Sequence, residues 1–187
     1  MMKISFAAIS AIAISLLVAC NQLTQYSINE REINKVLQRH NNFAKNINLS
    51  GIADVHVVLT NLSSAIGREE MNKVTLTSQA NLDMNSLFGS QKATIELKLQ
   101  ALPVLNKEEG AIFLQELEII NAKVQPEKMQ SMLETVLPYL NQSLRNYFNK
   151  QPAYILREDA SKSEALAKKF AKSIKVKPGE IVISLND

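Results

Sequence analysis

Hydrophobic positions with helical spacing run from Pro126 to Phe148. Apolar residues recur there at i, i+3, i+4 and i+7, which at about 100° per residue places them on one face of a helix. They are Met129, Met132, Leu133, Val136, Leu137, Leu140, Leu144, Tyr147 and Phe148. Because their arc covers roughly 160° of the helix, the pattern predicts a long helix that the rest of the protein half encloses. Pro126 fits the first helical position, where a missing N–H costs nothing.

Alternating apolar and polar positions precede this helix and predict antiparallel strands with one buried face. The expected strands cover residues 52–60, 73–84, 92–101 and 111–124. In the last of them the apolar positions change parity near Gln115 and Glu116, which indicates a β-bulge that curves the sheet. Strands of about twelve residues reach about 40 Å and a helix of about 23 residues reaches about 35 Å. The helix is therefore expected to lie along the sheet.

The apolar face of such a sheet is wider than a single helix, which is only about 10 Å across. Three alternatives would cover the remainder: the sheet curls around the long helix, a helix expected at residues 29–40 covers it, or an apolar ligand does. Asn29 and Glu32 form a capping box for that earlier helix. Residues 41–51 are interpreted as a loop.

Shorter elements are expected after the long helix. Residues 153–156 suggest an edge strand, and Ser161 with Glu164 forms a second capping box that begins a short helix. Residues 174–185 are interpreted as a hairpin closed by a type II turn at Pro178 and Gly179. The predicted fold class is therefore α+β: a long curved antiparallel sheet wrapped on a long amphipathic helix, with an N-terminal helix and a C-terminal helix and hairpin.

The first nineteen residues have the pattern of a cleaved signal peptide, because Lys3 is followed by an apolar run to Ala19 that is short for a membrane span. The run ends in Leu17-Val18-Ala19-Cys20, which resembles the bacterial lipobox, whose cysteine thiol receives a diacylglycerol. We therefore expect lipidation at Cys20, and two or three acyl chains anchor a protein stably. Asn21, where Asp would signal retention, resembles the pattern exported to the outer membrane. The domain prediction is signal peptide 1–19, lipidated tether 20–27 and one domain 28–187.

Composition fits one globular domain, since 46% of the 187 residues are hydrophobic. Removing Lys3 with the signal peptide leaves 20 basic against 18 acidic side chains, too weak a balance to predict nucleic acid as a partner. Cys20 is the only cysteine, so no disulfide is expected.

Catalytic chemistry has little support in the chain. The only histidines, His40 and His56, have no second ligand at a metal-binding spacing, and no nucleophile elbow or phosphate-binding loop occurs. We expect no metal, no cofactor and no enzymatic activity. Six lysines between Lys162 and Lys177 face only Glu164, and either contact lipid phosphates or form a solvated surface.

Several longer strings of the chain carry a resemblance to a known family. They are CNQLTQY (20–26), IGREE (66–70), NLDMNSLFGSQKA (81–93), QPEKMQ (125–130), LPYLNQSLRNYF (137–148), QPAYILRED (151–159) and VKPGEIVI (176–183). With them the chain resembles the YceB-type lipoproteins of enteric bacteria, a family without an assigned activity. That resemblance implies a small relative of the tubular lipid-binding (TULIP-like) fold, and it supplies no catalytic residues.

The leading hypothesis is an outer-membrane-anchored periplasmic protein that binds an acyl chain or phospholipid between the long helix and the sheet. The residues expected to line the ligand are Met84, Met129, Met132, Val136, Leu140 and Leu144. Flexible methionine thioethers suit an adaptable pocket, although they also suit an ordinary core. The alternative is a structural or adaptor lipoprotein with a filled core that acts through a protein partner.

Overall fold

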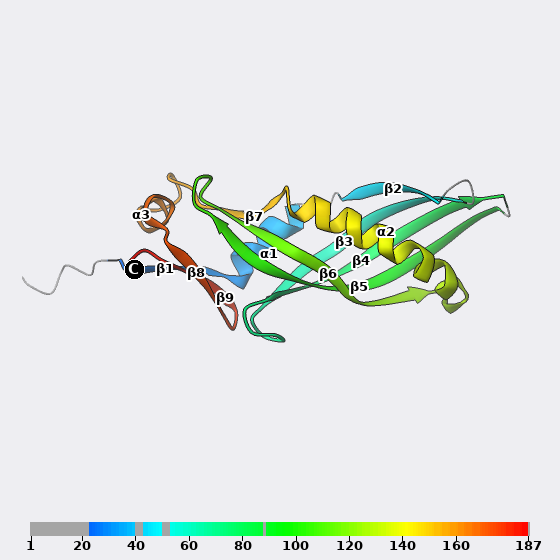
Figure 1. Cartoon of the computed structure of the whole chain (residues 1–187), viewed down its shortest axis with the longest axis horizontal. Coiled ribbons are helices and arrows are strands. Elements are labelled where there is room, and N and C mark those ends of the chain that lie inside the picture. Colours follow the sequence, from blue (N-terminus) through cyan, green and yellow to red (C-terminus); the bar gives the residue numbers. More distant parts are fainter. Residues whose placement is uncertain (1–22, 40–42, 50–52, 88, 187) are drawn as a thin grey trace, which may run out of the picture.

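A computed structural model describes residues 23–39, 43–49, 53–87 and 89–186 (Figure 1). Predictions for the signal peptide, Cys20, Asn21 and His40 lie outside these residues. None of the helices in the described part of the chain is long and apolar enough to cross a membrane.

A six-stranded antiparallel sheet forms the body of the protein and is strongly curled into a half-barrel (Figure 1). Its spatial order is β2 (Ala44–Leu49), β3 (Ala53–Ile66), β4 (Val74–Ser86), β5 (Gly89–Asn106), β6 (Ala111–Gln125) and β7 (Pro152–Ile155). Alternate residues of the long strands face the concave side and are buried, because a strand turns successive side chains to opposite faces. The predicted curved sheet and the edge strand at 153–156 are confirmed.

Irregular pairing accompanies the curl of the sheet. The register of β3 against β4 shifts between Thr60 and Ser63, where Asn61 has a positive φ of 55°. The register of β5 against β6 shifts twice, and Glu116 on β6 has φ 52°. Extra residues in one strand of a pair bend that strand and increase its twist. The bulge expected near Gln115 and Glu116 is therefore confirmed.

Two helices cover the concave face of the sheet. Helix α1 (Glu30–Arg39) packs on β3, and helix α2 (Gln130–Phe148), which follows the 3₁₀ turn η2 (Glu127–Met129), packs on β6 and β2 (Figure 1). Asn29 caps α1 as predicted, since its Oδ1 accepts from the Glu32 N–H at 3.1 Å while the Glu32 carboxylate accepts from the Asn29 N–H at 3.0 Å. Of the three ways to cover the wide apolar face, the protein uses both the curl and the earlier helix.

A second, three-stranded sheet lies at the end where the described chain begins and ends (Figure 1). Its order is β1 (Gln25–Asn29), β9 (Glu180–Ser184) and β8 (Ser173–Lys177), and α3 (Lys162–Phe170) packs beside β1. The predicted C-terminal hairpin is confirmed, and Gly179 takes the positive φ of 84° that its turn requires.

Two sequence assignments were wrong. Residues 41–51 were interpreted as a loop, but Ala44–Leu49 forms β2, whose polar first half hid the alternation. Residues 25–27, assigned to the tether, belong to β1 and pair with β9 from the other end of the chain. In both cases the strand is defined by a partner that local periodicity does not reveal.

Glu30 connects the two sheets through hydrogen bonds. Its carboxylate accepts hydrogen bonds from the backbone N–H of Ile66 and from Arg68 Nε, both at 2.9 Å, and its own N–H donates to the Gly179 carbonyl at 2.9 Å. Partial burial raises the pKa of this carboxyl, but the hydrogen bonds from Arg68 and Ile66 outweigh burial and lower the pKa below its ordinary value.

Candidate functional site: the interface between helix α2 and the curled sheet

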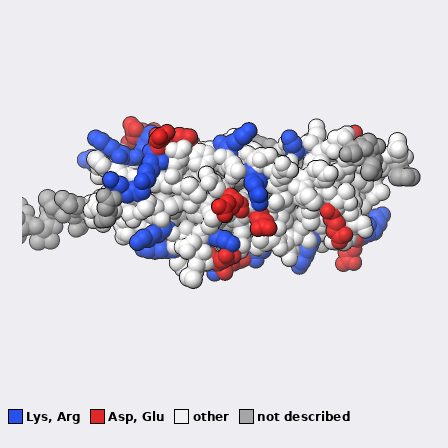
Figure 2. Space-filling model, in the orientation of Figure 1, with Lys and Arg blue, Asp and Glu red and all other residues white. Residues whose placement is uncertain are grey.

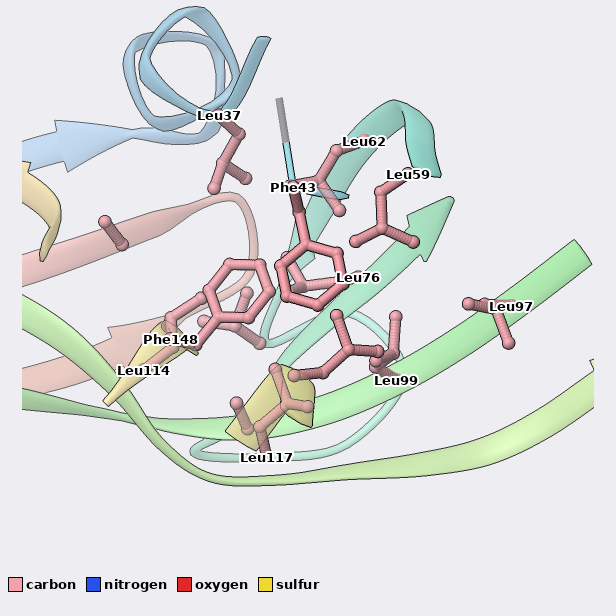
Figure 3. Close-up of a cluster of buried hydrophobic side chains, with 14 of the residues drawn as sticks. Leu37, Phe43, Leu59, Leu62, Leu76, Leu97, Leu99, Leu114, Leu117 and Phe148 are labelled. Carbon is pink, nitrogen blue, oxygen red and sulfur yellow. The ribbon is translucent and has the colours of Figure 1, made fainter. Parts of the chain in front are cut away.

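Helix α2 lies between the two edges of the half-barrel and closes it. It contacts the edge strand β2 on one side and, on the other, β6, which lies next to the short edge strand β7. Aliphatic side chains from the strands fill the space beneath the helices, and Figure 3 shows Phe43 and Phe148 surrounded by leucines that include Leu76, Leu99 and Leu117. The α2–sheet interface is therefore an extended apolar contact between one face of the helix and the concave face of the sheet.

Of the six residues predicted to line a ligand, five lie on α2 or on the η2 turn before it and Met84 lies on β4, and they differ in exposure. Val136, Leu140 and Leu144 are 0% exposed and Met129 is 4% exposed. Met84 and Met132 are partly buried and pack against the same core. In this conformation four of the six belong to a filled core, and the two methionines Met84 and Met132 are its partly accessible members.

The C-terminal half of α2 is fastened to both edges of the sheet. Asn141 Oδ1 accepts the backbone N–H of Ile119 at 2.8 Å, and Arg145 Nε donates to the Leu117 carbonyl at 3.0 Å. Both backbone groups belong to the bulged part of β6. On the other edge the ring of Phe43 contacts Tyr147 edge-on, with centroids 5.1 Å apart. Polar and aromatic contacts together hold this half in place.

The N-terminal half of α2 is held differently. Its side-chain hydrogen bonds stay within the helix, from Gln130 to Glu134 at 3.2 Å and from Thr135 to the Ser131 carbonyl at 3.0 Å. Among the described residues, no side-chain hydrogen bond joins residues 130–140 to the sheet, so apolar packing alone holds this half. Pro138 separates the two halves and removes one backbone hydrogen bond of the helix. The N-terminal half is thus the segment of α2 that can leave the sheet at the lowest cost in hydrogen bonds.

A surface depression of about 550 Å³ lies where α2 crosses the bulge of β6. Its lining is polar and consists of Gln115, Glu116, Glu118, Arg145 and Asn149. Such a lining does not suit an acyl chain, so this depression is not the lipid site that the sequence predicted.

Sequence reasoning missed a buried carboxylate, that of Glu164. Glu164 is 4% exposed and accepts hydrogen bonds from the hydroxyls of Tyr26 (3.3 Å) and Tyr154 (3.1 Å) and from the backbone N–H of Arg157 (3.0 Å). Burial raises the pKa of the Tyr154 hydroxyl and, to a smaller degree, that of Tyr26.

The expected capping box at the start of α3 is only half formed. Ser161 Oγ accepts the Glu164 N–H at 3.0 Å, but the Glu164 side chain turns inward instead of returning to Ser161. Because every buried side-chain polar atom of the described residues has a partner, the Glu164 cluster is a satisfied structural junction of α3, β1 and β7.

His56 lies on the exposed outer face of β3, with Nδ1 2.5 Å from Asn46 Oδ1. Within the described ranges, no three histidine, cysteine or carboxylate side chains are grouped as metal ligands. His56 is therefore a surface residue that forms a polar cross-strand pair with Asn46.

The fold defines the class of the protein, an α+β protein with a half-barrel sheet closed by helices. Residues 28–180 match the model of a family described as protein of unknown function (DUF1439). Proteins named "Uncharacterized lipoprotein YceB" from Escherichia coli and Shigella flexneri are each 68% identical over 187 residues, which is 100% of both chains. One from Salmonella typhimurium is 69% identical over 182 residues, or 97% of this chain and 98% of its own. The chain belongs to this family of lipoproteins.

Among solved structures, a "Crystal structure of lipopolysaccharide binding protein" aligns with 86% of this chain and 48% of its own, at 7% identity and a TM-score of 0.30.

Proposed function

We propose that this protein is an outer-membrane lipoprotein, anchored through Cys20 on the periplasmic face, that binds one acyl chain or phospholipid at the α2–sheet interface. The observation that carries the proposal is the unequal attachment of α2. Its C-terminal half is tied to both sheet edges by Asn141, Arg145 and Tyr147, whereas its N-terminal half rests on apolar contacts. Moving the N-terminal half aside opens an aliphatic face without breaking a hydrogen bond to the sheet.

Met84 and Met132 mark the entrance in this proposal. Both are partly buried against the core, while Val136 and Leu140 lie deeper and become accessible only when the helix moves. Thioether side chains adapt their shape to an irregular apolar guest at small cost. The protein acts by binding and not by catalysis, which is supported by the position of His56 on the outer face of the sheet, where it pairs with Asn46.

A second candidate function is favoured by the filled core. With Val136, Leu140 and Leu144 fully buried, the domain is complete without a guest. A structural or adaptor lipoprotein that works through a protein partner would need no more than this.

The binding proposal is tested by extracting lipids from the protein purified out of membranes and identifying them by mass spectrometry, together with titration of a fluorescent fatty acid. Met132→Glu is the key variant, since a carboxylate at the entrance is costly to bury against an acyl chain and repels an anionic headgroup. Ser131→Glu is the matched control, because it adds the same charge on the adjacent, exposed position of α2. We expect Met132→Glu to weaken binding at least tenfold and Ser131→Glu to leave it within about twofold; a factor of ten corresponds to about 1.4 kcal/mol.

Three results would count against binding: no co-purifying lipid beyond the Cys20 anchor, no saturable fatty-acid signal, or equal losses in the two variants. The adaptor function would then be the better account.

The anchor is tested separately with Cys20→Ser, which removes the acyl acceptor. We expect this variant to accumulate at the mass of the uncleaved precursor, whereas the parent is shortened and acylated. Asn21→Asp is expected to move the protein towards the inner membrane in an enterobacterial host. A mature, acylated Cys20→Ser product would refute the anchor, and unchanged fractionation of Asn21→Asp would refute the sorting assignment.

A further inference from the structure

Helix α3 lies at the end of the molecule where the described chain begins, beside β1 (Figure 1). The described chain begins at Leu23, three residues after Cys20. Three residues span at most about 10 Å even when fully extended. A lipid on Cys20 therefore keeps this end of the domain close to the membrane surface.

Contacts with both chain ends keep α3 and the segment after it at this position. The Tyr26 hydroxyl of β1 donates to Glu164 of α3 at 3.3 Å. The backbone N–H of Lys172 donates to the Ser184 carbonyl of β9 at 2.8 Å, and Leu185 N–H donates to Thr24 at 2.9 Å. Because these bonds include Thr24 and Tyr26, α3 stays close to the point at which the described chain begins.

The outward face of α3 combines apolar and basic side chains. At 100° per residue, Lys162, Leu166 and Lys169 lie within about 60° of one another, and Phe170 follows about 40° further on. The buried residues Glu164 and Ala167 lie on the opposite side. Leu166 and Phe170 are 43% and 46% exposed, and Lys169 Nζ lies 5.4 Å from the centre of the Phe170 ring. Exposed apolar side chains flanked by lysines are typical of helices that lie in a membrane interface.

The surface around α3 has unpaired positive charge. Residues 162–177 contain six lysines and a single acidic residue, Glu164, which is buried. Ion pairs engage Lys168 with Glu158 (3.1 Å) and Lys177 with Glu180 (3.8 Å). In the described part of the chain, Lys162, Lys169 and Lys175 have no carboxylate partner. Figure 2 shows basic side chains grouped at the end of the molecule where the described chain begins.

Acidic side chains limit this surface on one flank. Glu108 and Glu158 line a depression together with Lys107, Lys168 and Lys169. Glu158 pairs with Lys168. Lys169 lies at the boundary of this depression, whereas Lys162, Leu166 and Phe170 are not part of its lining.

We propose that the α3 face formed by Lys162, Leu166, Lys169 and Phe170 docks on the anionic headgroups of the membrane that holds the Cys20 anchor. Leu166 and Phe170 enter the interface between headgroups and acyl chains, and the lysines contact phosphates. The contact orients the domain with its α3 end on the membrane. This inference rests on the proposed anchor and is independent of acyl-chain binding at α2.

The test uses the acylated protein, reconstituted into vesicles of phosphatidylcholine with or without phosphatidylglycerol. Because the chain contains no tryptophan, Phe170→Trp introduces a single fluorescent reporter. In phosphatidylglycerol vesicles we expect its emission to shift to shorter wavelength and to be quenched by lipids with brominated chains, with a weaker effect in phosphatidylcholine alone. Tyr139→Trp, at a 49% exposed position of α2, is the control and is expected to be neither shifted nor quenched.

Charge variants in the Phe170→Trp background identify the contact. Lys162→Glu combined with Lys169→Glu is expected to abolish the quenching, since each basic residue near an anionic surface strengthens binding about fivefold. Lys128→Glu combined with Lys150→Glu makes the same change in net charge at exposed positions flanking α2 and is expected to retain quenching.

Vesicle flotation distinguishes the docking from the anchor. Protein that floats with the vesicles but shows no quenching at position 170, or equal quenching in both charge variants, overturns the docking and leaves the anchor intact. Protein that does not float overturns both.

Discussion

The Tyr154 hydroxyl of β7 donates a 3.1 Å hydrogen bond to Oε1 of Glu164, the buried carboxylate of α3. The same carboxylate accepts from Tyr26 of β1, so one side chain joins the start of the described chain to the segment that follows α2. A buried charge with three donors is stable, whereas donors left without an acceptor are costly.

Glu164→Ala is therefore expected to lower the free energy of unfolding by about 2–4 kcal/mol, measured from the urea denaturation midpoint. Glu158→Ala is the control, because Glu158 is 75% exposed and makes one surface ion pair with Lys168. Surface pairs contribute about 0–1 kcal/mol. Equal losses in the two variants would contradict the role assigned to Glu164.

The lowered pKa of the Glu30 carboxyl should make the junction between the two sheets sensitive to acid. Its folded-state pKa lies below the ordinary value of 4.5, so the deprotonated carboxylate stabilises the folded protein. This contribution is present above the ordinary pKa and is lost as the pH falls through the folded-state pKa. Between about pH 5 and pH 3, we expect the stability of the parent to fall more steeply than that of Glu30→Gln. Glu134→Gln, on the exposed face of α2, should follow the parent curve, and a Glu30→Gln curve parallel to the parent would refute the prediction.

The hydrogen bond of Asn141 to the sheet leads to a prediction about which half of α2 separates from the sheet more easily. Asn141→Ala leaves the N–H of Ile119 without its 2.8 Å acceptor and is expected to cost about 1–3 kcal/mol. In hydrogen exchange, the parent should exchange faster in residues 130–137 than in residues 141–148, and Asn141→Ala should reduce this difference. Gln142→Ala changes an exposed neighbour and is the control. Uniform exchange along α2 in the parent would contradict a mobile N-terminal half.

Truncation of Leu140 tests how completely protein side chains fill the interior beneath α2. It is 0% exposed, so Leu140→Ala is expected to cost about 2–5 kcal/mol in lipid-free protein. Leu137, which is only partly buried on the same helix, should cost less when truncated to Ala. Denaturation midpoints compare the two. A loss below about 1 kcal/mol for Leu140→Ala would show that this side chain faces space and not protein.

Local periodicity was sufficient to predict the helices α1 and α2, the four long strands and the bulge in β6. Each of these segments buries a continuous face, and a buried face imposes its period directly on the chain. The turn at Gly179 was likewise predictable, because it requires a positive φ that glycine adopts without strain. Helix, strand and turn were thus determined by neighbours within a few residues.

The edge strands of the two sheets and the packing of the interior depend on contacts between segments that are distant in the sequence. Strands β1 and β2 form because β9 and β3 offer them hydrogen-bonding partners, and Glu164 turns inward because tyrosines from β1 and β7 meet it there. The periodicity of the sequence indicates that Val136 and Leu140 are shielded from water. It does not indicate whether protein or ligand covers them. Only the tertiary structure placed protein over them, because the curl of the sheet brings β2 and β6 to opposite sides of one helix.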